Sequence, residues 1–275
     1  PQSIANRIID KIKDICPILS GAEMYHVKGT LKIPKWTVAN STHDVTVGYA
    51  TEFQEVTADS GKFTSIDLSG YLAAALVLIG KSVENNSEIN VVDFVISKIA
   101  EKVSAFIEDQ LLNGTGSSQA QGILNCANTV TAANNDKITV DDLIELQGAV
   151  KQAYQQGACW TMNNDTFTAI KKIKDTTGRM MIQTDASKAF PYTLLGKPVY
   201  LSDAMPKIAA NAKTVLYGNY NALAVNFREN INVQILREKY ATQHALGVIC
   251  WFEFDSKVID EQKCAVLVQA ASSTG

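Results

Sequence analysis

The sequence has little of the material from which catalytic and metal sites are built. Its three histidines, His26, His43 and His244, lie far apart, and none has a second ligand at metal-binding spacing. The motifs H-E-x-x-H and G-x-S-x-G, typical of zinc proteases and of α/β-hydrolases, do not occur. We therefore predict no enzyme activity, no catalytic residue, no metal site and no cofactor.

The cysteines exclude a disulfide framework and a zinc knuckle, because their number is odd and no C-x-x-C pair occurs. Cys159 lies beside Trp160 in an apolar segment, which suits an inert buried thiol better than a nucleophile. We predict buried, reduced thiols and folding in a reducing cytoplasm. The five cysteines are at positions 16, 126, 159, 250 and 264.

Charge and long apolar runs are also scarce. Charged residues make up 19% of the chain, and the net charge is -3 without a basic stripe, which disfavours a nucleic-acid-binding domain. The low charge is consistent with a surface hidden in contacts with other subunits. The longest apolar run, Leu72–Ile79, is far shorter than the ~20 residues of a membrane helix. We predict that this run is core and that no membrane is a partner.

Between residues 30 and 79, side chains of different character alternate with a period of two, which is typical of strands and predicts a long polar hairpin. The segment "ADSGK" between the two strands contains residues that favour a turn. An isolated hairpin is marginally stable in water, so we expect this arm to lie against a partner. Trp36 has two interpretations here. It covers the base of its own arm, or it anchors the arm in a neighbouring subunit, as aromatic residues often do at interfaces.

Apolar residues at helical spacing predict a helix over Val91–Leu112, about 33 Å long. The predicted buried stripe consists of Val92, Val95, Ile96, Ile99, Val103, Phe106, Ile107 and Leu111. Shorter helices are predicted from the N-cap Thr139 to Gly157 and over about 165–174, with strands in most of the remainder. The irregular mixture of helices and strands indicates an α+β fold.

The stretch "LLNGTGSSQAQGILN" (111–125) does not fit a phosphate-binding loop. A P-loop requires a lysine after its glycines, and a dinucleotide fingerprint requires glycine where Gln119 stands. Both motifs also follow a strand, whereas this stretch follows a helix. Gly114, Gly116 and Gly122 are interpreted either as a hinge or tight connector, or as an ordinary loop.

Four sequence motifs, in this order along the chain, resemble motifs of the major capsid proteins of tailed bacteriophages, which have the HK97 fold. The motifs are "LLNGTGSSQAQGILN", "MNNDTFTAIKKIKDTTGRMM", "LLGKPVYLSDAMP" and "VLYGNYNALAV". Two positions depart from the family pattern, because Ala120 replaces a common proline and Asn219 replaces the usual aspartate. The resemblance covers most of the chain.

The resemblance implies an α+β, HK97-like capsid fold with four parts. These are an N-terminal arm (1–29), an extended β-hairpin loop lying across a neighbouring subunit (30–70), a peripheral domain with the long spine helix (71–125 and 235–275), and an axial domain (126–234). On the hairpin, Trp36, His43, Glu52 and Lys62 are the expected intersubunit contacts, and Gly114, Gly116 and Gly122 the expected hinge.

The implied function is a major capsid protein that self-assembles, as hexamers and pentamers, into an icosahedral shell around double-stranded DNA. The expected partners are other copies of the chain, a portal, and scaffold or decoration proteins; the expected location is the virion, after assembly in the host cytoplasm. The chain begins with Pro1, so we expect proteolytic maturation as well as shell expansion. The alternative is an encapsulin-type compartment that holds an enzyme cargo.

Some relatives join their subunits by a lysine–asparagine isopeptide bond. Lys32, Lys35 and Lys62 are candidate lysines, but the region expected to carry the acceptor, residues 236–247, contains no asparagine. We therefore predict that no such bond forms.

Overall fold

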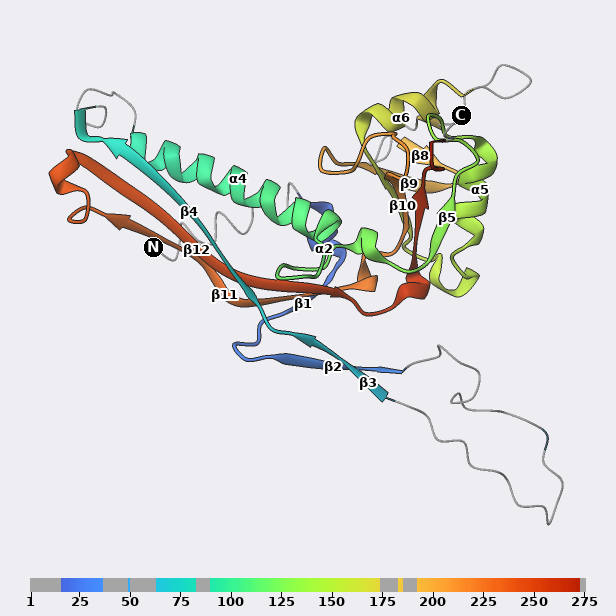
Figure 1. The fold of residues 1–275 in the computed structure, drawn as a ribbon, viewed down its shortest axis with the longest axis horizontal. Coiled ribbons are helices and arrows are strands. Elements are labelled where there is room, and N and C mark those ends of the chain that lie inside the picture. The colour runs from blue at the N-terminus through green and yellow to red at the C-terminus, as the bar shows by residue number, and fades with distance from the viewer. Residues whose placement is uncertain are drawn as a thin grey trace, which may run out of the picture.

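The fold consists of two β-sheets, one long helix and a projecting hairpin (Figure 1). The structure, a computed structural model, describes residues 16–36, 49, 63–82, 90–173, 183–184 and 192–272. The helices are α2 (Pro17–Gly21), α4 (Val91–Asn113), α5 (Val140–Gly148) and α6 (Asn164–Lys171), with 3-10 turns η1 (Ile123–Asn125), η2 (Gln152–Tyr154), η3 (Tyr220–Ala222), η4 (Ala241–Gln243) and η5 (Glu261–Lys263). The strands are β1 (Glu23–Tyr25), β2 (Leu31–Trp36), β3 (Phe63–Leu68), β4 (Tyr71–Gly80), β5 (Thr129–Thr131), β6 (Cys159–Met162), β7 (Gln183–Thr184), β8 (Tyr192–Leu194), β9 (Lys197–Leu201), β10 (Lys213–Gly218), β11 (Leu223–Leu236), β12 (Ala245–Val258) and β13 (Cys264–Val268).

The predicted long helix is confirmed as α4. The side chain of its N-cap, Asn90, accepts a hydrogen bond from the Asp93 amide, which satisfies one of the free donors of the first turn. Most of the predicted stripe is buried, and Ala100, Ser104 and Leu112 are buried with it. Phe106 was wrongly included in this stripe: it is 44% exposed, because it lies at the edge of the helix–sheet contact, with its ring edge-on to Phe252.

A four-stranded sheet lies under α4, in the order β1-β11-β12-β4 (Figure 1). The two long strands β11 and β12 are antiparallel, and β4 pairs with β12 from Tyr71 to Gly80. One face of this sheet packs with α4 and α2 into the first hydrophobic core, to which Val248, Cys250 and Phe252 belong. The helix therefore covers one face of the sheet only.

The prediction that Leu72–Ile79 is core is wrong. This segment is β4, at the edge of the four-stranded sheet, and its burial alternates. Ala73 and Ala75 pack against the first core, whereas Leu72, Leu76 and Leu78 are 61%, 47% and 49% exposed. Successive residues of a strand point to opposite faces, so a continuous apolar run is buried only where both faces are covered.

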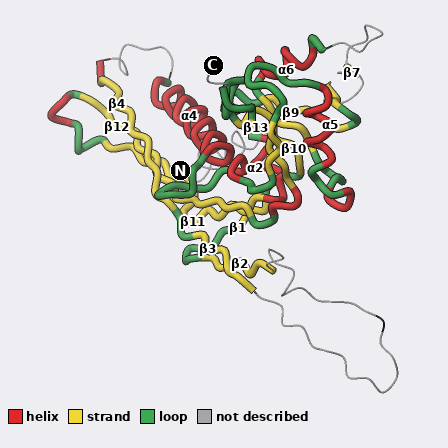
Figure 2. The backbone as a smooth tube through the Cα atoms, turned by 45° about the vertical axis from the view of Figure 1, so that its right-hand side comes forward, coloured by secondary structure: helices red, strands yellow, loops and turns green. Residues whose placement is uncertain are grey.

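The second sheet has seven strands, in the order β5-β13-β10-β6-β9-β8-β7. Figure 2 shows α5 and α6 grouped around this sheet, away from α4. On one face Trp160, Tyr217 and Leu267 form the second core with α5 and α6. On the other face Leu216 and Val266 join the first core, so the central strands are buried on both sides.

The shorter helices follow their predicted starts but not all of their predicted ends. Thr139 forms the capping box with Asp142, whose side chain accepts from the Thr139 amide at 2.7 Å. The helix α5 ends at Gly148 rather than Gly157, because the chain turns through η2 so that Tyr154 packs against the second core. Tertiary packing therefore interrupts a segment whose apolar pattern continues.

The base of the predicted hairpin is present as β2 and β3, which pair antiparallel from Leu31 opposite Leu68 to Trp36 opposite Phe63. Of the predicted hairpin, residues 37–62 lie outside the described residues except for Tyr49. In Figure 1 the hairpin leaves the four-stranded sheet on the side away from α4.

The two sheets do not follow the predicted boundary at residue 234. The strand β11 begins at Leu223 and belongs entirely to the four-stranded sheet, and β13, predicted to finish the peripheral part, lies in the seven-stranded sheet between β5 and β10. The cause is the connectivity, since the chain leaves the second sheet after β10 and returns to it only as β13. The assignment of the two sheets to peripheral and axial domains stays a prediction.

Candidate intersubunit surfaces

The outer face of the four-stranded sheet, opposite α4, is a candidate contact surface because it carries exposed apolar side chains. Leu72, Leu76 and Leu78 are alternate residues of β4 and share this face. Ile249 and Trp251, which lie opposite Leu76 and Ala74 in β12, share it too and are only partly buried. We call these five residues, Leu72, Leu76, Leu78, Ile249 and Trp251, the outer apolar row. Exposed apolar groups at this density are typical of a binding surface.

The edge of β4 adds a second property to this surface. In the four-stranded sheet β4 pairs with β12 on one side, and no described strand pairs with its other side. An open, apolar edge strand invites pairing with another chain. Phe106, on the flank of α4, is 44% exposed and lies beside Ala73 and Ala74 of β4, so it extends the apolar surface around that edge. The exposure of Phe106 could not be predicted from the sequence, because this residue fits the helical spacing of the buried stripe.

The predicted hairpin contacts are only partly placed by the structure. Trp36 ends β2 opposite Phe63, and His43, Glu52 and Lys62 lie outside the described residues. Of the other histidines, His26 is exposed and stacks on Phe227, and His244 is exposed in the turn before β12. Only one of the four predicted contacts therefore lies within the described residues, and all four stay predictions.

The three glycines after α4 form a compact connector. The Gly114 amide donates to Gln110 O, the Gly116 amide to Ala120 O and the Gly122 amide to Gly114 O. Gly116 has a φ of 76°, a conformation that favours glycine. A Cβ on Gly122 would lie 2.2 Å from Leu112 O, and one on Gly114 equally close to Ala120 O. These contacts leave room for hydrogen atoms only, so each of the three positions has its own physical reason for glycine.

The connector is also attached to the sheet and to the second core. The Gln121 amide donates to Ser256 O in β12, and the Asn125 side chain donates to Gly114 O and accepts from Lys213 Nζ. Ala120, where the family commonly has proline, is buried. The connector thus links α4, β12 and β10 through short hydrogen bonds.

The cysteines are confirmed as buried free thiols. Burial raises the pKa of Cys16 to about 12 and that of Cys159 to about 11, so both stay protonated near neutral pH. Within the described residues no group of histidine, cysteine and acidic side chains is arranged to hold a metal ion. None of the helices in the described ranges combines the length and the apolarity that a bilayer crossing requires.

Comparison with known proteins identifies the family. A sequence profile described as the phage capsid family matches residues 1–268. No curated protein sequence matches the chain significantly.

Solved structures agree with the profile. The chain is similar to the capsid of a native GTA particle, with a TM-score of 0.80 and 19% identity over 92% of this chain and 90% of that one. It is also similar to a structure of Microbacterium phage Oxtober96, with a TM-score of 0.70 and 13% identity over 92% and 91% of the two chains. A structure of Mycobacterium phage Bobi gives 0.68 and 12%, over 94% and 91%.

These likenesses confirm the predicted fold class, α+β and HK97-like. At such low identities they show the fold alone, whereas the sequence profile extends over nearly the whole chain and decides the family. The chain belongs to the phage capsid family.

Proposed function

We propose that many copies of this chain assemble, as hexamers and pentamers, into an icosahedral shell that encloses double-stranded DNA. Family membership already makes the chain a structural protein of the capsid type. The finer parts of the proposal are the geometry of the shell, its DNA content, its further partners and the absence of enzyme activity. The further partners are a portal and scaffold or decoration proteins.

The observation that carries the proposal is the outer apolar row beside the open edge of β4. Within the described residues this face has no second layer, although the central strands of the other sheet are covered on both faces. The occupant we propose is a second copy of the chain, because a shell surrounds each subunit with identical neighbours. Repeated contacts of this kind hold a shell together even where each one is weak.

The net charge of -3 supports enclosure of DNA without tight binding. Affinity for DNA comes mainly from basic side chains on phosphates, and an excess of them would fix the packaged DNA to the wall. The proposal also includes proteolytic maturation and shell expansion. In that expansion we assign Gly114, Gly116 and Gly122 to a tight connector, because two of them touch backbone oxygens too closely for any larger residue.

The test is the size and content of particles formed by the full chain. Light scattering and electron microscopy are expected to show hollow icosahedral shells, and material from its native source is expected to contain DNA. The proposal would be contradicted if the chain stayed monomeric even when it was produced as its uncleaved precursor and together with a scaffold protein. An enzyme cargo in place of DNA would favour an encapsulin-type compartment.

The same particles test for covalent joining of subunits. Since residues 236–247 contain no asparagine, we expect a single band near 29.9 kDa on a denaturing gel. A ladder of multiples that survives a reducing agent would contradict this prediction.

A further inference from the structure

The two strands of the hairpin leave the sheet at one point, between the end of β1 and the start of β4. Residues 26–30 lead from β1 into β2, and residues 69–70 lead from β3 into β4. Because β1 and β4 are the outer strands of the sheet and β11 and β12 the inner ones, the two hairpin strands must converge across β11 and β12. Any preferred direction of the hairpin has to be set at this crossing.

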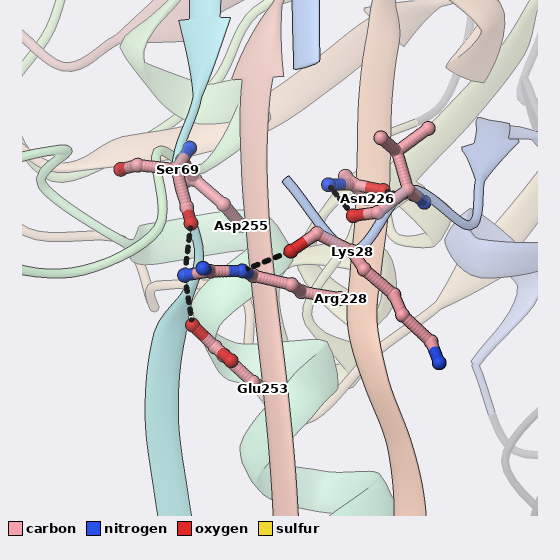
Figure 3. Close-up of polar contacts among 7 residues, drawn as sticks. Lys28, Ser69, Asn226, Arg228, Glu253 and Asp255 are labelled. Carbon is pink, nitrogen blue, oxygen red and sulfur yellow. Dashed lines mark hydrogen bonds and ion pairs between the residues drawn. The ribbon is translucent and has the colours of Figure 1, made fainter. Parts of the chain in front are cut away.

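Four polar side chains occupy the crossing, and all four come from the two inner strands (Figure 3). They are Asn226 and Arg228 on β11 and Glu253 and Asp255 on β12, and we call them the exit clamp. Asn226 lies opposite Asp255 in the register, and Asp255 and Glu253 are two apart on β12, so these three side chains share one face. Arg228 lies at a β-bulge between Phe227 and Glu229, and its hydrogen bond to Glu253 places its side chain on the same face. The intervening Phe227 and Phe254 stack on each other in the first core, on the opposite face.

Asn226 holds the strand that leads into β2. Its side-chain oxygen accepts from the Val27 amide at 2.9 Å, and its side-chain nitrogen donates to Val27 O at 3.2 Å. The side-chain amide thus takes the place of a backbone partner and holds the chain two residues beyond the end of β1 at Tyr25. Asn226 is fully buried, so these bonds are shielded from water.

Asp255 holds the other strand, since its Oδ2 accepts from the Ser69 amide at 2.9 Å. Its Oδ1 accepts from the Ser256 amide at 2.8 Å, which fixes the carboxylate on its own strand. Asp255 is only 1% exposed. Burial raises the pKa of its carboxyl, while the amide hydrogen bonds lower it.

Arg228 joins both strands at once. Its Nε donates to Lys28 O at 2.6 Å, and one terminal nitrogen donates to Ser69 O at 3.2 Å and to Glu253 Oε1 at 2.9 Å. The planar guanidinium has donors in fixed directions, so three acceptors on three segments fix their relative positions. Lysine offers one flexible point charge and cannot reproduce this geometry.

Gly70 completes the crossing. Its φ of 93° is a backbone conformation that favours glycine over other residues. A Cβ at this position would lie 2.8 Å from Glu253 Oε1 and 3.1 Å from Arg228 Cδ. The chain therefore turns into β4 directly against the Arg228–Glu253 pair. A turn that depends on one φ angle and on one exposed ion pair can change direction at little cost once that pair is broken.

We propose that Asn226, Arg228, Glu253 and Asp255 are the positioning residues that set the direction in which the hairpin leaves the subunit, with Gly70 as the pivot. This proposal rests on the proposed function, in which the hairpin lies across a neighbouring subunit. The buried pair Asn226 and Asp255 holds each strand to the sheet, and the more exposed pair Arg228 and Glu253 fixes the angle.

The test measures the direction of the hairpin in the full chain before shells form. Spin labels on cysteines introduced at Ser65 in β3 and at Ala105 in α4, both exposed, report the distance between the hairpin and the spine helix. The native cysteines are buried and stay unlabelled. The wild-type clamp is expected to give one narrow distance peak.

Arg228→Met, which removes the guanidinium and keeps an apolar stem, is expected to lose the narrow peak and to lower the yield of shells. The thermal melting of the subunit is expected to stay unchanged. Arg228→Lys should restore the peak in part. The control Arg237→Met, at an exposed position in the turn between β11 and β12, should leave both the peak and the yield unchanged.

A peak in Arg228→Met as narrow as in the wild type would overturn the clamp, whatever happens to assembly. Should Arg228→Met fail to fold, Arg228→Lys decides, and an unchanged narrow peak in that variant overturns the clamp equally. Failure of the wild-type chain to form shells would instead count against the proposed function. The distance measurement would then still decide the clamp, because it uses unassembled subunits.

Discussion

β10 and β4 each contain a continuous apolar run, Val215–Tyr217 in β10 and Leu72–Ile79 in β4, yet their surroundings are opposite. In β10, Val215 and Tyr217 point into the second core and Leu216 points into the first, so both faces are covered. In β4, Ala73 and Ala75 pack against the first core, and the leucines of the other face are exposed. The comparison teaches that an apolar strand indicates two covered faces, but not that one subunit supplies both covers.

The difference has a physical basis in how the two sheets are layered. The seven-stranded sheet lies between α5 and α6 on one side and the first core on the other. The four-stranded sheet has α4 and α2 on one face, and its other face carries the exit clamp and the outer apolar row. The central strands of the seven-stranded sheet are thus covered within the subunit, and we infer that the outer face of the four-stranded sheet is covered on assembly.

The largest expected effect is the difference in unfolding free energy between a leucine variant in β10 and one in β4. Leu216→Ala removes a side chain that is 1% exposed, and we expect it to lower the free energy of unfolding by about 2–5 kcal/mol. Leu76→Ala removes one that is 47% exposed, and we expect a change within about 0.5 kcal/mol. Denaturant unfolding of unassembled subunits measures both. Equal losses would show that the outer apolar row is already covered within one subunit.

The next effect concerns the connector between the two sheets. Gly122→Ala places a methyl group against Leu112 O, and we expect a loss of about 3 kcal/mol in the free energy of unfolding. The matched control is Gly148→Ala at the end of α5, where a Cβ meets nothing within 4 Å. We expect that variant to be neutral or stabilised by up to about 1 kcal/mol. A neutral Gly122→Ala would contradict the tight connector and support an ordinary loop.

A smaller effect per subunit is expected at the proposed interface. Leu76→Ala and Leu78→Ala should each weaken a contact by about 1–2 kcal/mol, the hydrophobic contribution of a partly buried leucine. Because every copy carries the change, the concentration at which shells form should rise, as followed by light scattering. The control is Ile144→Ala on α5, which removes a side chain that is 52% exposed on the complete sheet. If the control impairs assembly as strongly, the outer apolar row is not the preferred contact.

The smallest expected effect is a pH dependence of the free energy of unfolding, which arises where α4 contacts the end of β9. Ser202 Oγ donates to Glu108 Oε1 at 2.7 Å, joining α4 to the end of β9. Burial raises the pKa of Glu108, and the nearby Asp203 and Asp109 raise it further. The folded chain therefore holds this proton to higher pH than the unfolded chain, and stability falls as pH rises through the folded pKa.

Glu108→Gln removes the loss of stability at rising pH, because glutamine does not titrate, and its side-chain oxygen still accepts from Ser202. Above the folded pKa the variant should be slightly more stable than the wild type, and at low pH the two should converge. The gain is small because the side chain is only half-buried and partly screened by water. Thermal melting across the acidic range measures it. A constant difference between the two proteins at every pH would contradict this origin.

Local features of the fold could be predicted from the sequence. The helix α4 begins at the predicted residue, and the Thr139 capping box forms as expected, because both depend on neighbours within a few positions. The three glycines were singled out from the sequence, and their role as a hinge or tight connector stays a prediction. The close approach of Leu112 O to Gly122 depends on the folded backbone and could not be predicted. The end of α5, the sheet that receives β13 and the exposed face of β4 could not be predicted, since each depends on distant segments.

The exit clamp is the clearest example of a feature that the sequence predicts only in part and that the tertiary structure completes. The sequence alone determined that residues 226–228 and 253–255 alternate polar and aromatic side chains, which is the pattern of a strand with two different faces. Only the fold brings Arg228 to Lys28 O, 200 positions away, and to Ser69 O, 159 positions away. The acceptors are backbone oxygens, which every residue carries, so no residue type in the sequence marks them as partners. Their meeting is set by the order of strands in the sheet and by the direction in which the hairpin leaves it.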